Sequence, residues 1–89
     1  MSTGITLHLR FFASVRERLG CSEERVILPV DVKTVGQVRQ WLMARGGVWA
    51  DTLAHGLNLR MAYQLEMCGE AEEITEDGEL AFFPPVTGG

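Results

Sequence analysis

The amino-terminal third of the chain changes its hydrophobic period twice. Residues 5–11 alternate between apolar and polar side chains, which predicts a β-strand with one buried face. Residues 12–19 follow a helical period that ends at Gly20, a residue that fits a helix carboxyl terminus. Residues 25–30 alternate again, and Pro29 near their end favours a strand at the edge of a sheet. The residues expected on the buried face of the helix are Phe12, Val15 and Leu19.

The strongest helix signal lies in the middle of the chain. Thr34 and Gln37 have the spacing of a capping box, in which a hydroxyl and an amide side chain bind the free backbone N–H groups at a helix start. Apolar residues then recur every three or four positions until Gly46-Gly47, which predicts the main helix. Residues 48–58 give a mixed pattern, with one turn of helix before His55-Gly56.

Two further extended segments complete the predicted fold. Residues 59–65 and 79–83 are expected to be strands, and Asp77-Gly78 between them has the chemistry of a tight turn with positive φ. Alternation along the last strand places Phe82 in the core and Phe83 on the exposed face.

The order of these elements predicts an α+β domain in which a mixed β-sheet packs on one main helix. The chain has 89 residues, of which 46% are hydrophobic and 22% are charged, so we expect one domain over residues 1–83 and an extended tail over residues 84–89. A domain of this size buries one small core and leaves little room for a deep active-site cavity.

The distribution of apolar residues and cysteines limits the cellular context. No apolar run approaches the roughly 18 residues needed to cross a bilayer, and polar residues interrupt the apolar positions near the amino terminus. We therefore expect no membrane partner and a cytoplasmic location. Cys21 and Cys68 are far apart in the sequence without metal-ligating neighbours, so we expect two buried, reduced thiols.

The charge is unevenly divided along the chain. The net charge is −4, and residues 46–89 carry eight acidic side chains and one basic one. With Lys33 as the single lysine, this balance argues against nucleic-acid binding. The acidic cluster between residues 70 and 79 fits a basic protein partner, and a solvated hairpin is the alternative interpretation.

The last six residues, 84–89, have no charged side chain and follow the last predicted strand directly. Pro84 and Pro85 favour a stiff polyproline II stem that projects the tail into solvent. Gly88 and Gly89 lack Cβ atoms, so their backbone could enter a narrow channel and present the terminal carboxylate as the reacting group. A frayed terminus without function is the competing interpretation.

The combination of this fold pattern with a terminal Gly-Gly resembles the ubiquitin-like β-grasp carriers. The run from Phe82 to Gly89 resembles the ending of the MoaD-type sulfur carriers, the small subunits of molybdopterin synthase, and residues 9–17 and 34–39 resemble other segments of that family. The sequence departs from the family at Tyr63, where Asn is usual, and at residues 78–80, where Gly-Asp-Glu-Val is expected.

The resemblance implies that this chain is not an enzyme on its own and binds no cofactor or metal. It implies an adenylating partner that uses ATP to activate the Gly89 carboxylate, a sulfur donor that converts it to a thiocarboxylate, and a large subunit where the sulfur attacks cyclic pyranopterin monophosphate. It also implies an assembly of two small and two large subunits. The residues expected to contact partners are Phe83, Pro84, Pro85, Val86 and Thr87, and those expected to carry the chemistry are Gly88 and Gly89.

Three other functions stay open at this stage. A sulfur carrier for another pathway, such as thiamine synthesis, would use the same terminal chemistry, although Phe-Phe-Pro-Pro before the tail favours the molybdenum pathway. A ubiquitin-like modifier would join its carboxyl terminus to lysines of other proteins. A passive interaction module would make no use of Gly88 and Gly89.

Overall fold

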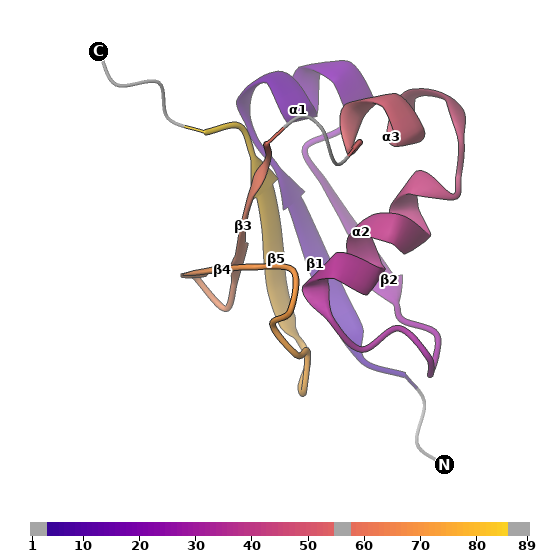
Figure 1. The fold of residues 1–89 in the computed structure, drawn as a ribbon, viewed down its shortest axis with the longest axis vertical. Helices are drawn as coiled ribbons and strands as arrows, with labels where there is room; N and C mark the ends of the chain where they lie inside the picture. Colours follow the sequence, from indigo (N-terminus) through magenta and orange to yellow (C-terminus); the bar gives the residue numbers. More distant parts are fainter. Residues whose placement is uncertain (1–3, 55–57, 86–89) are drawn as a thin grey trace.

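Eight helices and strands make up the part of the chain that the computed structural model describes, residues 4–54 and 58–85 (Figure 1). In chain order they are β1 (Thr6–Phe11), α1 (Ala13–Leu19), β2 (Glu23–Ile27), α2 (Val35–Met43), α3 (Gly47–Thr52), β3 (Arg60–Tyr63), β4 (Glu66–Cys68) and β5 (Gly78–Phe83). The strands form one sheet in the order β2-β1-β5-β3-β4. The pair β1–β5 is parallel and the other pairs are antiparallel, so the predicted α+β fold with a mixed sheet is confirmed.

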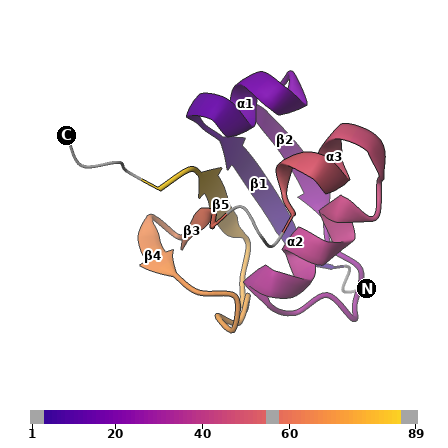
Figure 2. The ribbon, with the colours of Figure 1, turned by 45° about the horizontal axis from the view of Figure 1, so that its top comes forward.

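The core lies between the sheet and the helices α2 and α3, which pack on one of its faces (Figure 2). Strand β1 alternates between buried and half-buried residues, as its sequence period predicts. Phe11 from β1 stacks on Phe82 from β5, with ring centroids 6.0 Å apart. Burying a side chain of this size contributes about 1.5–3 kcal/mol. The fully buried aliphatic residues around these rings include Leu7, Leu9, Val35, Val38, Leu42 and Leu80.

The start of α2 and the end of α1 follow the capping signals in the sequence, whereas α2 ends at Met43, before the predicted stop at Gly46-Gly47, and Gly47 begins α3. The Gln37 backbone N–H donates to Thr34 Oγ1 over 3.1 Å, and the Thr34 N–H donates to Gln37 Oε1 over 3.2 Å, so the predicted capping box starts α2. Gly20 closes α1 in the left-handed conformation, with φ of 77°. In the mixed region, α3 is the predicted turn of helix, and the expected break at His55-Gly56 lies outside the described residues.

Two predictions in the amino-terminal half are wrong in detail. Phe12 does not lie on the buried face of α1, because it is the extended N-cap residue and 38% of its surface is exposed. Strand β2 is at the edge of the sheet as predicted, but it ends at Ile27 and not at Val30. The Leu28 N–H makes the last ladder bond, to the Ile5 carbonyl, and Pro29 has no N–H to continue it.

The strand predicted over residues 59–65 is shorter in the structure, where β3 covers Arg60–Tyr63. Strand β3 ends at Tyr63, and Gln64 and Leu65 form a tight turn in which both φ angles are positive, at 55° and 68°. Strand β4 returns from this turn and was not predicted. The expected turn at Asp77-Gly78 is also wrong, because Gly78 is the first residue of β5 and has no positive φ.

Two arginines connect the helices to the rest of the fold. Arg39, only 3% exposed, donates to the Leu53 and Ala54 carbonyls and to Glu70 Oε2 at 2.7 to 2.9 Å. Arg45 binds both carboxylate oxygens of Glu24 in β2, at 3.0 and 2.7 Å. The hydrogen bond from Arg45 lowers the pKa of Glu24, against the opposing effect of burial.

Candidate functional site

The carboxyl end of β5 is where the domain passes into its predicted tail. Strand β5 lies between β1 and β3, so both of its edges are paired up to its end. The Phe12 N–H donates to the Phe82 carbonyl over 3.2 Å, and Arg60 lies opposite Phe83 in the ladder. The chain then continues into Pro84 and Pro85 (Figure 1). The position at which the chain leaves the sheet is therefore fixed by neighbours on both sides.

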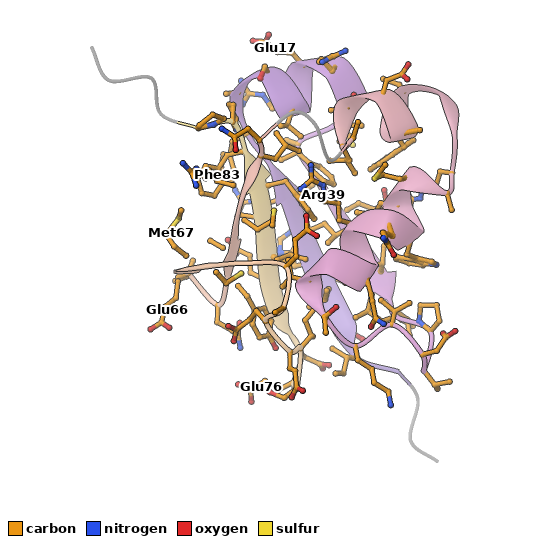
Figure 3. The ribbon with its side chains drawn as sticks, viewed as in Figure 1. Glu17, Arg39, Glu66, Met67, Glu76 and Phe83 are labelled. Atoms are coloured by element: carbon orange, nitrogen blue, oxygen red, sulfur yellow. The ribbon has the colours of Figure 1, made fainter. Side chains whose placement is uncertain are left out.

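The two phenylalanines at this end have different surroundings. Phe82 is completely buried, which confirms its predicted place in the core. Phe83 points away from α2 and α3 (Figure 3). Phe83 is half-buried. It lies on the predicted face of the sheet, but it is less exposed than the sequence predicts. Pro84 and Pro85 are half-buried as well.

Other apolar side chains lie near Phe83 on the open face of the sheet. Ala62 of β3 lies opposite Ala81 of β5 and opposite Met67 of β4, which is 64% exposed. Phe12 reaches the same face, because its ring lies 5.4 Å from the guanidinium of Arg10, a half-buried residue on the polar face of β1. We call Phe12, Ala62, Met67, Ala81 and Phe83 the tail-base surface.

Basic residues border the tail-base surface. Arg10 lies over the Phe12 ring and 3.6 Å from a carboxylate oxygen of Glu79, and the exposed Arg60 lies beside Phe83. An apolar patch with cationic margins is the composition that protein partners bind well, since the apolar area supplies affinity and the charges supply orientation.

The sequence patterns did not identify Phe12 and Met67 as parts of this surface. Adjacent residues at the end of a strand point to opposite faces of the sheet, so a buried Phe11 indicates that Phe12 lies on the open face. Met67 had no such signal, because the turn at Gln64 and Leu65 contains neither Gly nor Asn.

The described residues contain no candidate metal centre. Within residues 4–54 and 58–85, no three His, Cys, Asp or Glu residues could hold a metal ion together, and no helix is long and apolar enough to cross a membrane. His8 Nε2 lies 2.5 Å from Glu23 Oε1 on the polar face of the sheet. His8 is half-buried there and belongs to no candidate metal group among the described residues.

The two cysteines are half-buried and unpaired, not fully buried as predicted. Burial raises the pKa of the Cys21 thiol and of the Cys68 thiol, so both stay protonated at neutral pH. Because the thiolate is the nucleophilic form, neither cysteine is prepared for sulfur transfer. The other predicted site residues, Val86, Thr87, Gly88 and Gly89, lie outside the described residues, and their roles stay predictions.

Comparison with known proteins gives a consistent result. The model of the ThiS family matches residues 9–89. The molybdopterin synthase sulfur carrier subunit of Escherichia coli is 39% identical over 79 residues, which cover 89% of this chain and 94% of that protein.

Solved structures of similar fold extend this result. The crystal structure of SAMP1, small archaeal modifier protein 1, from Haloferax volcanii superimposes with a TM-score of 0.69 at 26% identity and covers 94% of this chain and 99% of that one. The ubiquitin of Caldiarchaeum subterraneum, with a TM-score of 0.53 at 15% identity over 96% of this chain and 98% of that one, shares the fold alone. The predicted ubiquitin-like β-grasp fold is confirmed.

Proposed function

The chain belongs to the ThiS family, and from this membership we propose that it is the sulfur carrier subunit of a molybdopterin synthase. The observation that carries the proposal is the 39% identity to a carrier subunit of that name over 94% of its length. A small subunit of this kind has a large subunit as its partner. The proposal places the carrier in the cytoplasm, where ATP is available to the adenylating partner.

The chemistry is proposed to take place at the terminal carboxylate of Gly89. A carboxylate is a poor acyl donor because its charge is delocalised, so it needs activation before sulfur can replace oxygen. An adenylating enzyme would join it to AMP from ATP, and a sulfur donor would then displace AMP and leave a thiocarboxylate. The sulfur would next be donated to cyclic pyranopterin monophosphate on the large subunit. No cofactor or metal on this chain enters the scheme.

The arrangement at the carboxyl end of β5 supports a scheme in which this chain carries the sulfur and its partners catalyse the reactions. The described residues offer anchoring and a partner surface, they hold no candidate metal group, and the pKa values of both thiols are raised. Phe82 fixes the last strand in the core, while Phe83, Pro84 and Pro85 lie at the surface where a partner would meet the tail. In the proposal, Val86 and Thr87 contact the channel of the large subunit, and Gly88 lets the terminal residue enter it.

Intact mass spectrometry tests the proposal directly. The full chain is incubated with ATP, its cognate adenylating enzyme and a sulfur donor, and the expected product is the free chain with one oxygen replaced by sulfur. The loaded carrier mixed with the large subunit and cyclic pyranopterin monophosphate should return to its original mass as the dithiolene product forms. A chain that is never adenylated would contradict the proposal.

A second candidate function is protein modification. It is favoured by the similarity to SAMP1, small archaeal modifier protein 1, at 26% identity. The same incubation distinguishes the two functions when other proteins are present. A modifier would be joined through its terminal carboxylate to lysine side chains of those proteins, and the products would have the summed mass of both chains. A carrier for thiamine synthesis would be sulfurated as well, but its loaded form would not react with cyclic pyranopterin monophosphate.

A further inference from the structure

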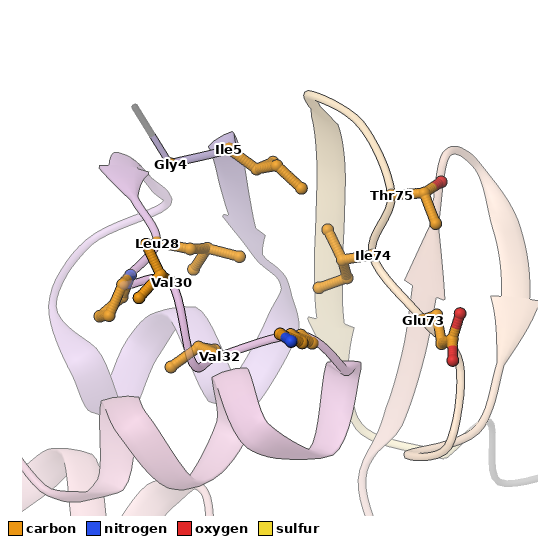
Figure 4. A pocket seen from close by; sticks show the side chains of 10 residues that line it. Gly4, Ile5, Leu28, Val30, Val32, Glu73, Ile74 and Thr75 are labelled. Atoms are coloured by element: carbon orange, nitrogen blue, oxygen red, sulfur yellow. The ribbon is translucent and has the colours of Figure 1, made fainter. Parts of the chain in front are cut away.

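An apolar groove lies beside the amino end of β1, and Figure 4 shows the side chains that line it. Its volume is about 480 Å³, within the range of about 300–1,000 Å³ typical of ligand pockets. One wall comes from the segment after β2, and the other from the segment before β5. Its apolar lining consists of Ile5, Leu28, Pro29, Val30, Val32 and Ile74, with Lys33 and Glu73 among the polar lining residues.

Backbone hydrogen bonds fix the walls of this groove. The Leu28 N–H donates to the Ile5 carbonyl and the Ile74 N–H to the Lys33 carbonyl, both over 2.8 Å. Leu28 and Ile74 are buried, whereas Val30 is 84% exposed. Isolated exposed apolar residues are common, but an exposed valine at the margin of a formed apolar groove is a feature of binding sites.

The charged residues that line the groove are Lys33 and Glu73, of opposite sign, and further carboxylates flank the lining segments. Among residues 28–33 and 70–77, all of which the structure describes, six carboxylates are accompanied by Lys33 as the one cation. Glu70 has Arg39 as its partner. The side chains of Glu72, Glu73, Glu76 and Asp77 are exposed. A ligand with positive charges therefore complements this end of the molecule.

The groove and the start of the tail lie at opposite ends of β5. The groove adjoins the amino ends of β1 and β5, which run parallel, whereas the tail leaves the carboxyl end of β5 (Figure 1). A six-residue strand spans about 20 Å.

We propose that this groove is a second docking site, for a basic segment of a protein partner. One aliphatic or aromatic side chain of the partner inserts between Val30 and Ile74, and flanking arginines or lysines lie near Glu73 and its acidic neighbours. A second copy of this acidic chain, a nucleic acid or an anionic membrane would bring negative charge to the groove and is disfavoured. The proposal does not depend on the sulfur-carrier function, because it concerns the other end of the domain.

Nuclear magnetic resonance titration of the full ¹⁵N-labelled chain tests this proposal. The probe is a synthetic peptide with one tryptophan flanked by two arginines on each side. Matched peptides replace the tryptophan by serine or the arginines by glutamate. We expect saturable shifts of the amide signals of residues 28–33 and 73–75 with the basic tryptophan peptide, and shifts at least about tenfold weaker with either control peptide.

Three variants make the test specific. Val30→Ser, at an exposed position, removes the apolar contact without changing the charge; it should keep the melting temperature and weaken the basic peptide at least about tenfold. Ile27→Ser, exposed on β2 but outside the groove, is the matched control and should leave affinity within about twofold. Glu73→Lys should weaken the basic peptide and strengthen the acidic one.

Several outcomes would overturn the proposal. They are the absence of saturable shifts, equal binding of all peptides, shifts that map to the tail-base surface, and equal loss in Val30→Ser and Ile27→Ser. Peptide-independent line broadening that grows with protein concentration would assign the groove to self-association instead. None of these results bears on sulfuration of Gly89. The titration can therefore reject the docking site without rejecting the sulfur-carrier function, which mass spectrometry tests.

Discussion

The two ends of β5 are held in different ways. At the amino end the contacts are polar: the Tyr63 hydroxyl donates to the Glu76 carbonyl over 2.6 Å, and the Thr6 N–H donates to Asp77 Oδ1 over 2.8 Å. At the carboxyl end the main anchor is apolar, because Phe82 is enclosed in the core. Its neighbour Phe83 is left at the surface.

This difference separates the contacts that stabilise β5 from the residues that present the tail to a partner. Hydrogen bonds between side chains and backbone fix the start of β5 in register, so the strand cannot slide along β1 and β3. The buried Phe82 ring then sets where the chain leaves the sheet. Residues beyond Phe82 contribute little to the core, so they can be selected for partner contact and terminal chemistry.

The largest expected effect comes from changing the tip of the tail. Deleting Gly89, or adding residues after it, should abolish thiocarboxylation because the reacting carboxylate is lost or moved. The melting temperature should stay within about 2 °C, since the deletion removes no core residue. Intact mass spectrometry and thermal unfolding measure the two quantities on the same sample. Full sulfuration of either variant would contradict a reacting group at Gly89.

The buried anchor should have the next largest effect. Phe82→Ala removes a completely buried ring that stacks on Phe11, and the expected loss is about 3–5 kcal/mol of unfolding free energy. Denaturant unfolding measures it. Phe82→Leu keeps most of the apolar volume and is the matched control, with a smaller loss. A loss below about 1 kcal/mol for Phe82→Ala would mean that the carboxyl end of β5 has another anchor.

Phe83 tests the other side of the same strand end. Phe83→Ala should weaken binding of the large subunit about tenfold, because a half-buried aromatic on the tail-base surface is removed. Its unfolding free energy should fall by much less than that of Phe82→Ala. Isothermal titration calorimetry with the purified large subunit measures the affinity.

Leu65→Ala is the matched control for Phe83→Ala. Leu65 is 82% exposed in the turn between β3 and β4, outside the tail-base surface, and its truncation should leave the affinity unchanged. Unchanged affinity in Phe83→Ala would show instead that the ring serves the fold of this chain and not its partner.

Much of the fold was predictable because local signals and burial agree. The capping box at Thr34 and the alternation of β1 specify their elements without reference to the rest of the chain. The end of β2 was placed too late because Val30 continues an alternating pattern that the backbone does not follow. Its environment in the groove depends on Ile74, which is far away in the sequence.

The candidate site was only partly predictable for a related reason. The tail residues were recognisable from their chemistry and from family resemblance. The surface beside them is assembled from β1, β3, β4 and β5, and its composition follows from strand order and register. Strand β4 was missed because Gln64 and Leu65 adopt positive φ without the residues that usually mark such a turn. The place of Met67 on the tail-base surface depends on β4, so the sequence did not predict it either.

The smallest expected effect is at the amino end of β5. A Cβ on Gly78 would lie 2.0 Å from Gln64 Oε1, so Gly78→Ala must displace that side chain. The Gln64 amide binds the Glu79 N–H and the Asp77 carbonyl, and losing these exposed bonds should cost about 1 kcal/mol. The Gln64 side chain can lie across β5 because Gly78 has no Cβ atom at that position.

A double-mutant cycle identifies the cause of that loss. In a Gln64→Ala background the obstruction is gone, and Gly78→Ala should be neutral or slightly stabilising, because alanine restricts the unfolded chain more than glycine does. Denaturant unfolding of the four proteins gives the coupling. An equal loss in both backgrounds would show that the backbone of β5 itself requires glycine at position 78. The polar contacts of Gln64 would then be a consequence of the register and not one of its causes.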